Sequence, residues 1–488
     1  MSQYILSIDQ GTTSTRTFLI DHDLNVKGTA QKEFKQHYPK PGWVEHNPEE
    51  IWASTLQTIK EALAKSKVDP KNIAGIGITN QRETTILWDR KTGKPVYNAI
   101  VWQDRRTSER CRELKEKNLE GIVREKTGLV LDPYFSGTKI EWLLKNTQAT
   151  GDLAFGTIDT FLLWRLTGGK VHATDATNAS RTLLMNLKTL NWDPEILELF
   201  KISSSLLPKI DSCSEIYGTT KGLEVLPDGI PIAGMAGDQQ AALIGQACFE
   251  TGEAKCTYGT GSFILMNIGK EPRPSHHGLI TTLAYKIKDN VAYAFEGSAF
   301  IAGAAVQWLR DGLKIIQKSS DVEELASQVP DSGGVVFVPA LVGLGAPHWK
   351  PEARGVITGI DRSTTAAHIA RATLEGIAFC QSDILQAMTS DVGKSLTVLK
   401  VDGGASANNL LMQFQSDILQ VPISRPKMLE TTVLGAAFLA GLAVGLWKDL
   451  NDIKKSWKED KKFSPQISKE KAQEKIKLWQ MAISHLRD

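Results

Sequence analysis

Short apolar runs alternate with segments of helical periodicity along the first half of the chain. Residues 4–8, 17–20 and 73–79 are short and mostly apolar, which predicts buried strands. Asn47 and Pro48 suit the N-cap and first position of a helix, one face of which then repeats at helical spacing through Ile51, Thr55, Ile59 and Leu63. This alternation of strands and helices predicts an α/β fold.

The second half of the chain repeats this plan. Residues 255–258 and 262–267 predict a hairpin like the one near the start of the chain. Further strands are expected at 291–295, 335–339 and 396–401, long helices at 296–313 and 365–388, and a Lys- and Glu-rich surface helix within 449–488.

Residues 431–447 form an uncharged, mostly apolar stretch that is rich in Gly and Ala. The stretch is shorter than the ~20 residues that a membrane-spanning helix needs. We therefore expect a buried helix packed closely on a sheet, and no membrane span.

Length and composition limit the classes of protein to which this chain can belong. The 488 residues are too many for one hydrophobic core, so we expect two domains, residues 1–249 and 250–488, divided where the hairpin recurs. The chain is 41% hydrophobic and 23% charged, which is typical of a globular protein, and a net charge of +2 offers no basic surface for nucleic acid. The five cysteines form no CxxC pair and the N-terminus has no signal-peptide pattern, which favours the cytoplasm.

Two turns rich in Gly, Thr and Ser, one in each half, follow apolar strands. The first lies within residues 8–16 (IDQGTTSTR) and the second within 258–262 (YGTGS). Backbone N–H groups and hydroxyls in such turns can hold phosphate oxygens. Between them lies Asp238 in the run GDQQ, where a carboxylate can accept a proton. Together these features predict phosphoryl transfer from a nucleotide held between two similar domains.

Each of these motifs also has a plainer interpretation. The first turn can be an ordinary β-turn, Asp238 can be a helix N-cap, and Arg82 with Glu83 can be a solvated ion pair. The Gly403–Gly404 pair can be a loop before a helix. A Walker A loop is excluded because Met388 stands where its first Gly should be, and no complete GxGxxG occurs, which disfavours a P-loop kinase and a simple dehydrogenase.

Nine stretches, in order along nearly the whole chain, resemble the FGGY carbohydrate kinases of the actin/hexokinase ATPase superfamily. They are residues 9–16, 39–46, 78–85 (ITNQRETT), 98–106, 132–139 (DPYFSGTK), 236–242, 258–262, 343–349 and 401–409. The resemblance implies two actin-like (ribonuclease H-like) α/β domains flanking a central cleft. The run ITNQRETT with Trp102 and Tyr134 favours members that act on glycerol over those that act on a ketopentose or tetritol.

The resemblance also assigns roles to single residues. It implies that Arg82, Glu83 and Tyr134 bind the polyol hydroxyls and that Asp238 is the general base, with Gln239 beside it and Trp102 and Phe263 along the carbon skeleton. It implies that ATP contacts Thr12, Thr13, Ser14, Arg16, Thr260, Gly303, Gln307, Gly404 and Asn408. Asp9 would lie near Mg²⁺, through water, because Mg²⁺ keeps much of its hydration.

The implied reaction is the ATP-dependent phosphorylation of glycerol to sn-glycerol 3-phosphate by a cytoplasmic homo-oligomer, a dimer or tetramer. Some relatives carry a Gly- and Arg-rich loop for fructose 1,6-bisphosphate. Residues 221–229 here contain no Arg and two acids, and no His lies between 172 and 276, so we expect neither that inhibition nor control by His phosphorylation. A chaperone of the superfamily would continue into a β-rich peptide-binding domain, and an inactive relative would have lost Asp9 or Asp238.

Overall fold

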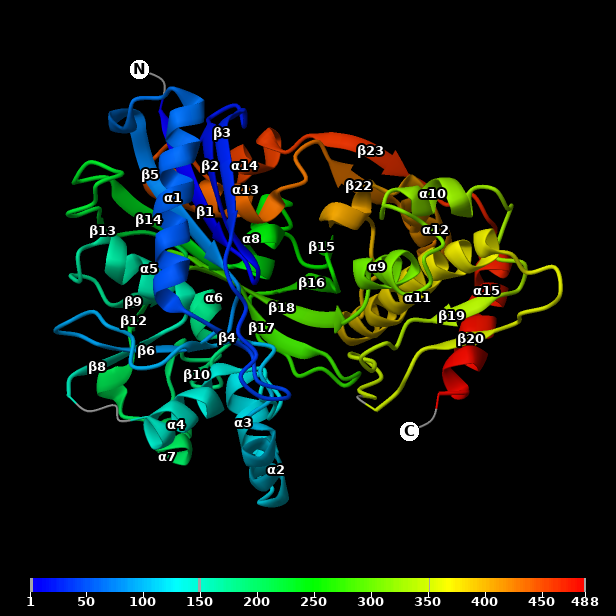
Figure 1. The fold of residues 1–488 in the computed structure, drawn as a ribbon, viewed down its shortest axis with the longest axis horizontal. Coiled ribbons are helices and arrows are strands. Elements are labelled where there is room, and N and C mark those ends of the chain that lie inside the picture. The colour runs from blue at the N-terminus through cyan, green and yellow to red at the C-terminus, as the bar shows by residue number, and fades with distance from the viewer. Residues whose placement is uncertain (1–2, 148–150, 351, 487–488) are drawn as a thin grey trace.

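Two mixed β-sheets, one from each half of the chain, form the framework of the computed structural model (Figure 1). The structure describes residues 3–147, 151–350 and 352–486. The first sheet runs, from edge to edge, β13 (Ser214–Thr219), β14 (Pro231–Gly237), β5 (Ile73–Asn80), β1 (Tyr4–Gln10), β2 (Ser14–Asp21) and β3 (Val26–Glu33). The second runs β17 (Ile280–Ile287), β18 (Asn290–Ala299), β16 (Ser262–Gly269), β15 (Ala254–Tyr258), β21 (Leu399–Asp402), β22 (Ile423–Pro426) and β23 (Glu459–Phe463).

The two sheets share one topology at their centres. Strand β1 pairs antiparallel with β2 and parallel with β5, and β14 runs parallel to β5. In the same way β15 pairs antiparallel with β16 and parallel with β21, beside which β22 runs parallel. The predicted α/β class and the repeated hairpin are confirmed.

Helices and short strands complete each half. The first half adds α1 (Pro48–Ser66), α2 (Ser108–Glu116), α3 (Glu120–Thr127), α4 (Ser136–Asn146), α5 (Ile158–Leu166), α6 (Ala176–Ala179) and α7 (Pro194–Phe200), with β4 (Glu45–His46), β6 (Ile86–Asp89), β7 (Ala99–Ile100), β8 (Leu153–Gly156), β9 (Ala173–Asp175), β10 (Met185–Asn186), β11 (Asn191–Trp192) and β12 (Lys209–Asp211). The second half adds α9 (Gly303–Asp311), α10 (Asp321–Ala326), α11 (Ala366–Val392), α12 (Asn409–Leu419), α14 (Leu450–Ser456) and α15 (Lys469–Ser484), with β19 (Val336–Val338) and β20 (Val356–Thr358).

Helix α1 begins as its sequence predicts. The side chain of Asn47 accepts a hydrogen bond from the Glu49 backbone N–H at 2.9 Å, and Pro48 occupies the first turn. The face formed by Ile51, Ile59 and Leu63 is buried, and the helix packs on β2 and β3. Amphipathic periodicity therefore placed this helix correctly on the sheet.

Two helices cross between the sheets, and each contacts the sheet of the other half. Helix α8 (Asp238–Gly245) follows β14 but contacts β15, β16 and β17, whereas α13 (Thr431–Ala443) follows β22 but packs on β1, β5 and β14. A Cβ at Gly435 would overlap the carbonyl oxygen of Ala241, so the crossing needs glycine there. The predicted buried helix within 431–447 is confirmed. Of the helices in the described ranges, none combines the length and apolarity that crossing a bilayer requires.

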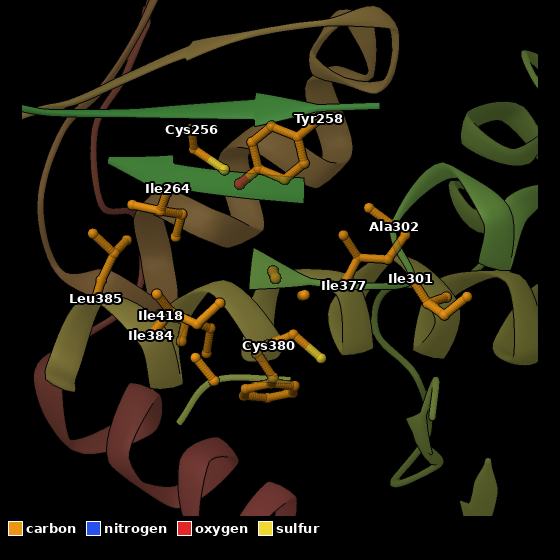
Figure 2. Close-up of a cluster of buried hydrophobic side chains, with 14 of the residues drawn as sticks. Cys256, Tyr258, Ile264, Ile301, Ala302, Ile377, Cys380, Ile384, Leu385 and Ile418 are labelled. Carbon is orange, nitrogen blue, oxygen red and sulfur yellow. The ribbon is translucent and has the colours of Figure 1, made fainter. Parts of the chain in front are cut away.

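The core of the second half lies between its sheet and α11 (Figure 2). Cys256, Tyr258 and Ile264 from β15 and β16 meet Ile377 and Ile384 from α11, and all five are completely buried. The Tyr258 hydroxyl donates to a glutamine side chain on α12, at 2.8 Å, so its burial leaves no donor unpaired. This packing fixes the turn that follows Tyr258.

Two predicted helices are correct only in part. Residues 296–299 belong to strand β18, which pairs with both β16 and β17, so only Gly303–Asp311 of the predicted segment 296–313 is helical. Within residues 449–486 two helices, α14 and α15, are separated by β23, which closes the edge of the second sheet against β22. Residues 487–488 of the predicted helix lie outside the described residues. In both segments long-range strand pairing overrides local helical preference.

Candidate active site

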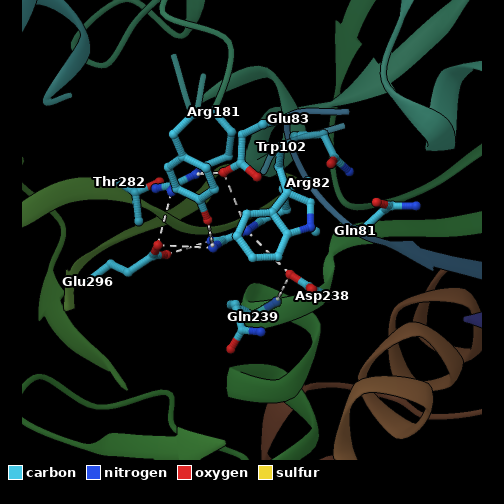
Figure 3. Close-up of polar contacts among 12 residues, drawn as sticks. Gln81, Arg82, Glu83, Trp102, Arg181, Asp238, Gln239, Thr282 and Glu296 are labelled. Carbon is cyan, nitrogen blue, oxygen red and sulfur yellow. Dashed lines mark hydrogen bonds and ion pairs between the residues drawn. The ribbon is translucent and has the colours of Figure 1, made fainter. Parts of the chain in front are cut away.

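Polar side chains gather where two neighbouring parallel strands end (Figure 3). Arg82 and Glu83 follow β5, and Asp238 and Gln239 follow β14. Glu83 has a backbone φ of 60°, a left-handed conformation that is uncommon for a residue with a side chain. Ligands of α/β sheets gather at such carboxyl ends, which marks this group as the candidate site.

Arg82 is almost completely buried and its donors are largely engaged. Nη1 and Nη2 donate to the two carboxylate oxygens of Glu296 at 2.5 and 2.9 Å. The same nitrogens reach Gln240 at 3.2 Å and the Tyr134 hydroxyl at 3.3 Å. Nε lies 3.2 Å from Asp238 Oδ1. The solvated ion pair considered from the sequence is therefore wrong, because Arg82 belongs to a buried network.

Asp238 is the most accessible acid of this group. Its side chain is 32% exposed, against 2% for those of Arg82 and Glu83. The N-cap of α8 is Gly237, so Asp238 is the first helical residue and the N-cap interpretation is wrong. Burial raises the pKa of Asp238 to about 6, an effect that the charge of Arg82 opposes. The carboxylate is thus ionised at neutral pH and can accept a proton.

Aromatic rings lie beside this polar group. Trp102 and Tyr134 meet at 5.6 Å between ring centroids, nearly edge to face. The Trp102 indole N–H donates to Thr12 Oγ1 at 2.9 Å, which joins the predicted polyol contacts to the first turn. Phe263 lies in β16 directly after the second turn and is partly buried. The structure thus brings Trp102 and Tyr134 together, whereas Phe263 belongs to the second sheet and its contact with the substrate stays a prediction.

The first turn joins β1 to β2 and carries charge. The Gly11 N–H donates to the Ser14 carbonyl at 2.9 Å, and Thr12 and Thr13 lie between them. Behind the turn Arg16 pairs with Asp9 at 2.5 Å and with Glu430, next to α13, at 2.5 Å. The charge of Asp9 raises the pKa of Arg16 above its usual value. The first turn therefore connects two paired strands, and an ion pair lies next to it on those strands.

The second turn and the start of α9 are tied together. The Thr260 carbonyl accepts hydrogen bonds from Ala302 and Ala304 at 2.8 and 3.0 Å, and the Gly303 N–H donates to the Gly259 carbonyl at 3.0 Å. A Cβ at Gly303 would come within 2.7 Å of that carbonyl, so only glycine fits. The structure thus joins Thr260 to Gly303, while Gln307 lies one turn further along α9 and is exposed.

Gly404 and Asn408 lie at the end of β21. Nothing lies within 4 Å of a Cβ built on Gly404, so the space beside it is open. Asn408 is the N-cap of α12 and accepts a hydrogen bond from the Leu411 N–H at 2.8 Å. The interpretation of this loop as the start of a helix is therefore correct. The adenosine contact at Gly404 stays a prediction.

Sequence reasoning missed four buried charged residues around the site. Arg181, in the loop after α6, donates from Nε to Glu83 at 2.7 Å and from Nη2 to Glu296 at 2.9 Å. Glu296 was hidden because a helix was expected where β18 runs. The other two are Lys139, which donates to the carbonyls of Glu83 and Tyr134, and Lys255, which donates to Gln239 and Thr257. For Lys255 and Glu296 the available signal was a charged side chain within a mostly apolar strand, since such residues are rarely buried without partners.

Burial shapes the charge state of Lys139. Its side chain is inaccessible to solvent, and burial lowers its pKa to about 7, against the attraction of Glu83. Its two carbonyl acceptors lie 3.3 Å and 2.5 Å from Nζ. Lys139 thus ties together the backbones of two predicted polyol contacts.

Comparison with family models and curated proteins agrees with this geometry. The N-terminal and C-terminal domain models of the FGGY family of carbohydrate kinases match residues 4–245 and 254–444. The glycerol kinase of Myxococcus xanthus is 57% identical over 490 residues, covering 99% of each chain. Glycerol kinase 2 of Saccharolobus solfataricus is 56% identical and covers 98% of this chain and 97% of its own.

Solved structures extend the comparison. The Plasmodium falciparum glycerol kinase with ADP superposes with a TM-score of 0.93 at 43% identity, covering 99% of this chain and 98% of its own. The ligand-bound xylulose kinase of Lactobacillus acidophilus reaches a TM-score of 0.88 at 26% identity, covering 99% and 97%. The expected two-domain, actin-like architecture is thereby confirmed. With both family domains matched in order and relatives more than half identical over their full length, this chain belongs to the FGGY family of carbohydrate kinases.

Proposed function

We propose that this protein transfers the γ-phosphoryl group of ATP to glycerol and forms sn-glycerol 3-phosphate. The observation that carries the proposal is the cluster of Arg82, Glu83, Tyr134 and Asp238 at the ends of β5 and β14. It offers donors and acceptors for adjacent hydroxyls of a small uncharged polyol. Relatives that are 54–57% identical over the full chain carry the name glycerol kinase, which supports the same reaction.

Asp238 is the proposed general base. Its Oδ1 already accepts the Gln239 N–H at 2.7 Å and lies near Arg82, whereas Oδ2 has no hydrogen-bond partner among the described residues. Oδ2 would therefore accept the proton of the attacking hydroxyl. The proton leaves as the oxygen attacks, so base strength matters most in the transition state. Trp102 and Phe263 would contact the carbon skeleton.

The two turns are the proposed phosphate contacts. The P. falciparum relative was solved with ADP, and ATP is the nucleotide implied here. Backbone N–H groups and the hydroxyls of Thr12, Thr13, Ser14 and Thr260 would hold phosphate oxygens, and Arg16 would add positive charge. Gly303 and Gln307 would contribute from α9, and Gly404 and Asn408 would lie beside the adenosine.

Mg²⁺ fits the residues that are present. No group of three or more His, Cys, Asp or Glu in the described ranges could hold a metal alone. Mg²⁺ commonly binds one or two carboxylates, substrate phosphates and several waters, so the single carboxylate of Asp9 beside the first turn is sufficient. Asp9 would hold the ion through water, and the ion would neutralise charge on the β- and γ-phosphates.

A coupled ADP-release assay over a panel of polyols tests the proposal. Glycerol should give the highest kcat/KM, above dihydroxyacetone, erythritol, ribitol and xylulose. Xylulose is the informative competitor, because a xylulose kinase shares the fold. A preference for xylulose or ribitol would overturn the assignment to glycerol while leaving the family intact.

The division into units of residues 1–249 and 250–488 leads to a further proposal. The predicted ATP contacts belong to both units, so all of them engage only if the units close on the nucleotide. Solution scattering should give a smaller radius of gyration with glycerol and ADP than without them. Identical curves would count against a mobile pair of units.

We also propose that the enzyme works in the cytoplasm as a homo-oligomer, a dimer or tetramer. Size-exclusion chromatography with light scattering tests the oligomeric state.

A further inference from the structure

Four buried charged side chains form a closed ring beside the proposed polyol site (Figure 3). Arg82 pairs with Glu296, Glu296 with Arg181, and Arg181 with Glu83, at 2.5, 2.9 and 2.7 Å. Glu83 closes the ring 3.7 Å from Arg82. Every member is at most 2% exposed. Two positive and two negative charges alternate, so the ring as a whole is neutral.

The ring draws on both halves of the chain. Arg82, Glu83 and Arg181 belong to the first half, whereas Glu296 projects from β18 of the second sheet. The loop that carries Arg181 is also fastened to the second sheet, because Ser180 and Thr282 of β17 share a hydrogen bond of 3.0 Å. The orientation of Arg82 and Glu83 therefore depends on where the second sheet lies.

The ring determines which atoms remain for a substrate. Glu296, Gln240 and Tyr134 accept from both Nη atoms of Arg82, while Nε lies 3.2 Å from Asp238 Oδ1. Arg181 occupies Oε1 of Glu83, while Oε2 has no hydrogen-bond partner in the part of the chain that the structure describes. The polar groups of Arg82 and Glu83 that remain for a substrate are thus one donor, Nε–H, and one acceptor, Oε2, a combination that suits hydroxyl groups.

Stability alone is a weak reason to keep this ring. Buried ion pairs often stabilise a fold no better than apolar residues of similar size. Arg181 also leaves Nη1 buried without a hydrogen-bond partner, which is unfavourable. Its guanidinium lies 5.6 Å from the Tyr134 ring and 5.2 Å from the Phe135 ring, so it also supports a predicted polyol contact.

We propose that Arg181 and Glu296 are positioning residues for the polyol site: they hold Arg82 and Glu83 in the orientation that binds glycerol and link that orientation to the second sheet. This inference rests on the proposed function, since glycerol is its substrate. Neither residue needs to touch the substrate. Their effect on binding is exerted through Arg82 and Glu83.

The variant Glu296→Gln tests the proposal, because it keeps the size of the side chain and removes its charge. The KM for glycerol should rise on the order of 10- to 100-fold, as when a charge-assisted contact is lost, while the KM for ATP stays within about twofold. The matched control is Glu375→Gln on α11. Glu375 is also a buried carboxylate paired with an arginine, Arg371, at 3.0 Å, but it belongs to a helix that contributes no member of the ring. It should leave the KM for glycerol unchanged. An unchanged KM for glycerol in Glu296→Gln, or an equal rise for ATP, would overturn the proposal.

Substitutions of Arg181 provide an independent measurement, also if Glu296→Gln fails to fold. Arg181→Lys keeps the charge but cannot bridge two carboxylates as a guanidinium does, so its KM for glycerol should lie between those of the wild type and Arg181→Gln. The double variant Arg181→Gln/Glu296→Gln should raise KM by less than the product of the single effects, because one ring is broken in each case. Multiplying effects, or wild-type KM in Arg181→Gln, would refute a shared role. A wild-type enzyme that does not phosphorylate glycerol would instead refute the proposed function.

Discussion

The two turns connect their strands in the same way, but the side chains beside them differ. Counting back from each turn, the second cross-strand pair is Asp9 with Arg16 in the first sheet and Thr257 with Phe263 in the second. The first pair is a salt bridge, whereas the second is a hydroxyl opposite an aromatic ring. The repeated fold therefore supplies two similar turns with different charged neighbours: the Asp9–Arg16 ion pair at the first, and Lys255, which donates to Thr257, at the second.

The same contrast appears at the helices that follow the last parallel strand of each sheet. Asp238 begins α8 after β14, and Glu430 precedes α13 after β22. Asp238 faces Arg82, which is 2% exposed, whereas Glu430 faces Arg16, which is 28% exposed. Water therefore screens the Glu430–Arg16 pair more strongly than the Asp238–Arg82 pair.

Removing the acid of the first helix should have the largest effect. Asp238→Asn should lower kcat by ~10²–10⁴, the usual loss for a missing general base, and should leave ADP binding within about twofold. Turnover assays and calorimetric ADP titration measure the two quantities. Glu430→Gln, at the N-cap of α13, is the comparison and should retain most of kcat. A variant Asp238→Asn with more than about a tenth of wild-type kcat would show that the base lies elsewhere.

Substitutions beside the two turns should affect the KM values of different substrates. Arg16→Ala should raise the KM for ATP roughly 10- to 150-fold, the loss of ~1.5–3 kcal/mol expected for a charge-assisted hydrogen bond. Phe263→Leu should raise the KM for glycerol more than that for ATP. Steady-state kinetics with each substrate varied in turn provide the measurement. If Arg16→Ala changed only the KM for glycerol, the proposed contact of Arg16 with the ATP phosphates would be incorrect.

The crossing of α8 and α13 should be sensitive to one methyl group. Gly435→Ala places a Cβ against the Ala241 carbonyl, and overpacking of this kind destabilises by about 1–3 kcal/mol. Gly121→Ala on α3 is the matched control, because nothing lies within 4 Å of its Cβ. There alanine should stabilise slightly through its helix propensity. Urea unfolding measures both, and equal effects of the two substitutions would argue against a tight crossing.

The pH dependence of the reaction should report the Asp238 carboxyl. Its pKa of about 6 lies above the usual value, so the group becomes protonated as pH falls through 6 and can then accept no proton. The kcat/KM should therefore fall about tenfold per pH unit below 6. Burial also raises the pKa of Asp159 to about 6, outside the site, so Asp159→Asn should leave this acid limb in place. A limb that disappears in Asp159→Asn would belong to a different group.

Fructose 1,6-bisphosphate should have the smallest effect, namely none. In the loop of residues 221–229, Lys221 pairs with Asp228 at 2.5 Å, and the same carboxylate accepts the Gly222 N–H at 2.7 Å. The loop's own acid therefore satisfies the groups that an anion would need. Initial rates at saturating substrates should match those in potassium sulfate of equal ionic strength. Inhibition below millimolar concentration would indicate a bisphosphate site on another surface.

The sequence predicted the fold better than it predicted the environment of the site. Apolar periodicity and capping residues located the repeated hairpins, α1 and the buried helix α13, because these depend on neighbouring residues. Arg82 and Asp238 were found from local motifs for the same reason. Glu296 and Arg181 were missed, because their role depends on β18 pairing with two strands and on a contact between the two halves. Periodicity within one segment contains no information about such pairing.

The crossing of α8 and α13 also has a consequence for synthesis on the ribosome. One side of the first sheet, including Ile5, Ala233 and Ala236, is covered by Leu434 and Ala437 of α13. The sheet is complete once β14 has been translated, but its cover emerges only after residue 443. A nascent chain between these two points carries an uncovered apolar sheet face, and transiently exposed apolar surface of this kind makes a chain prone to aggregate. The time spent in translating β15 to α13 is therefore the period in which this protein is most exposed to aggregation.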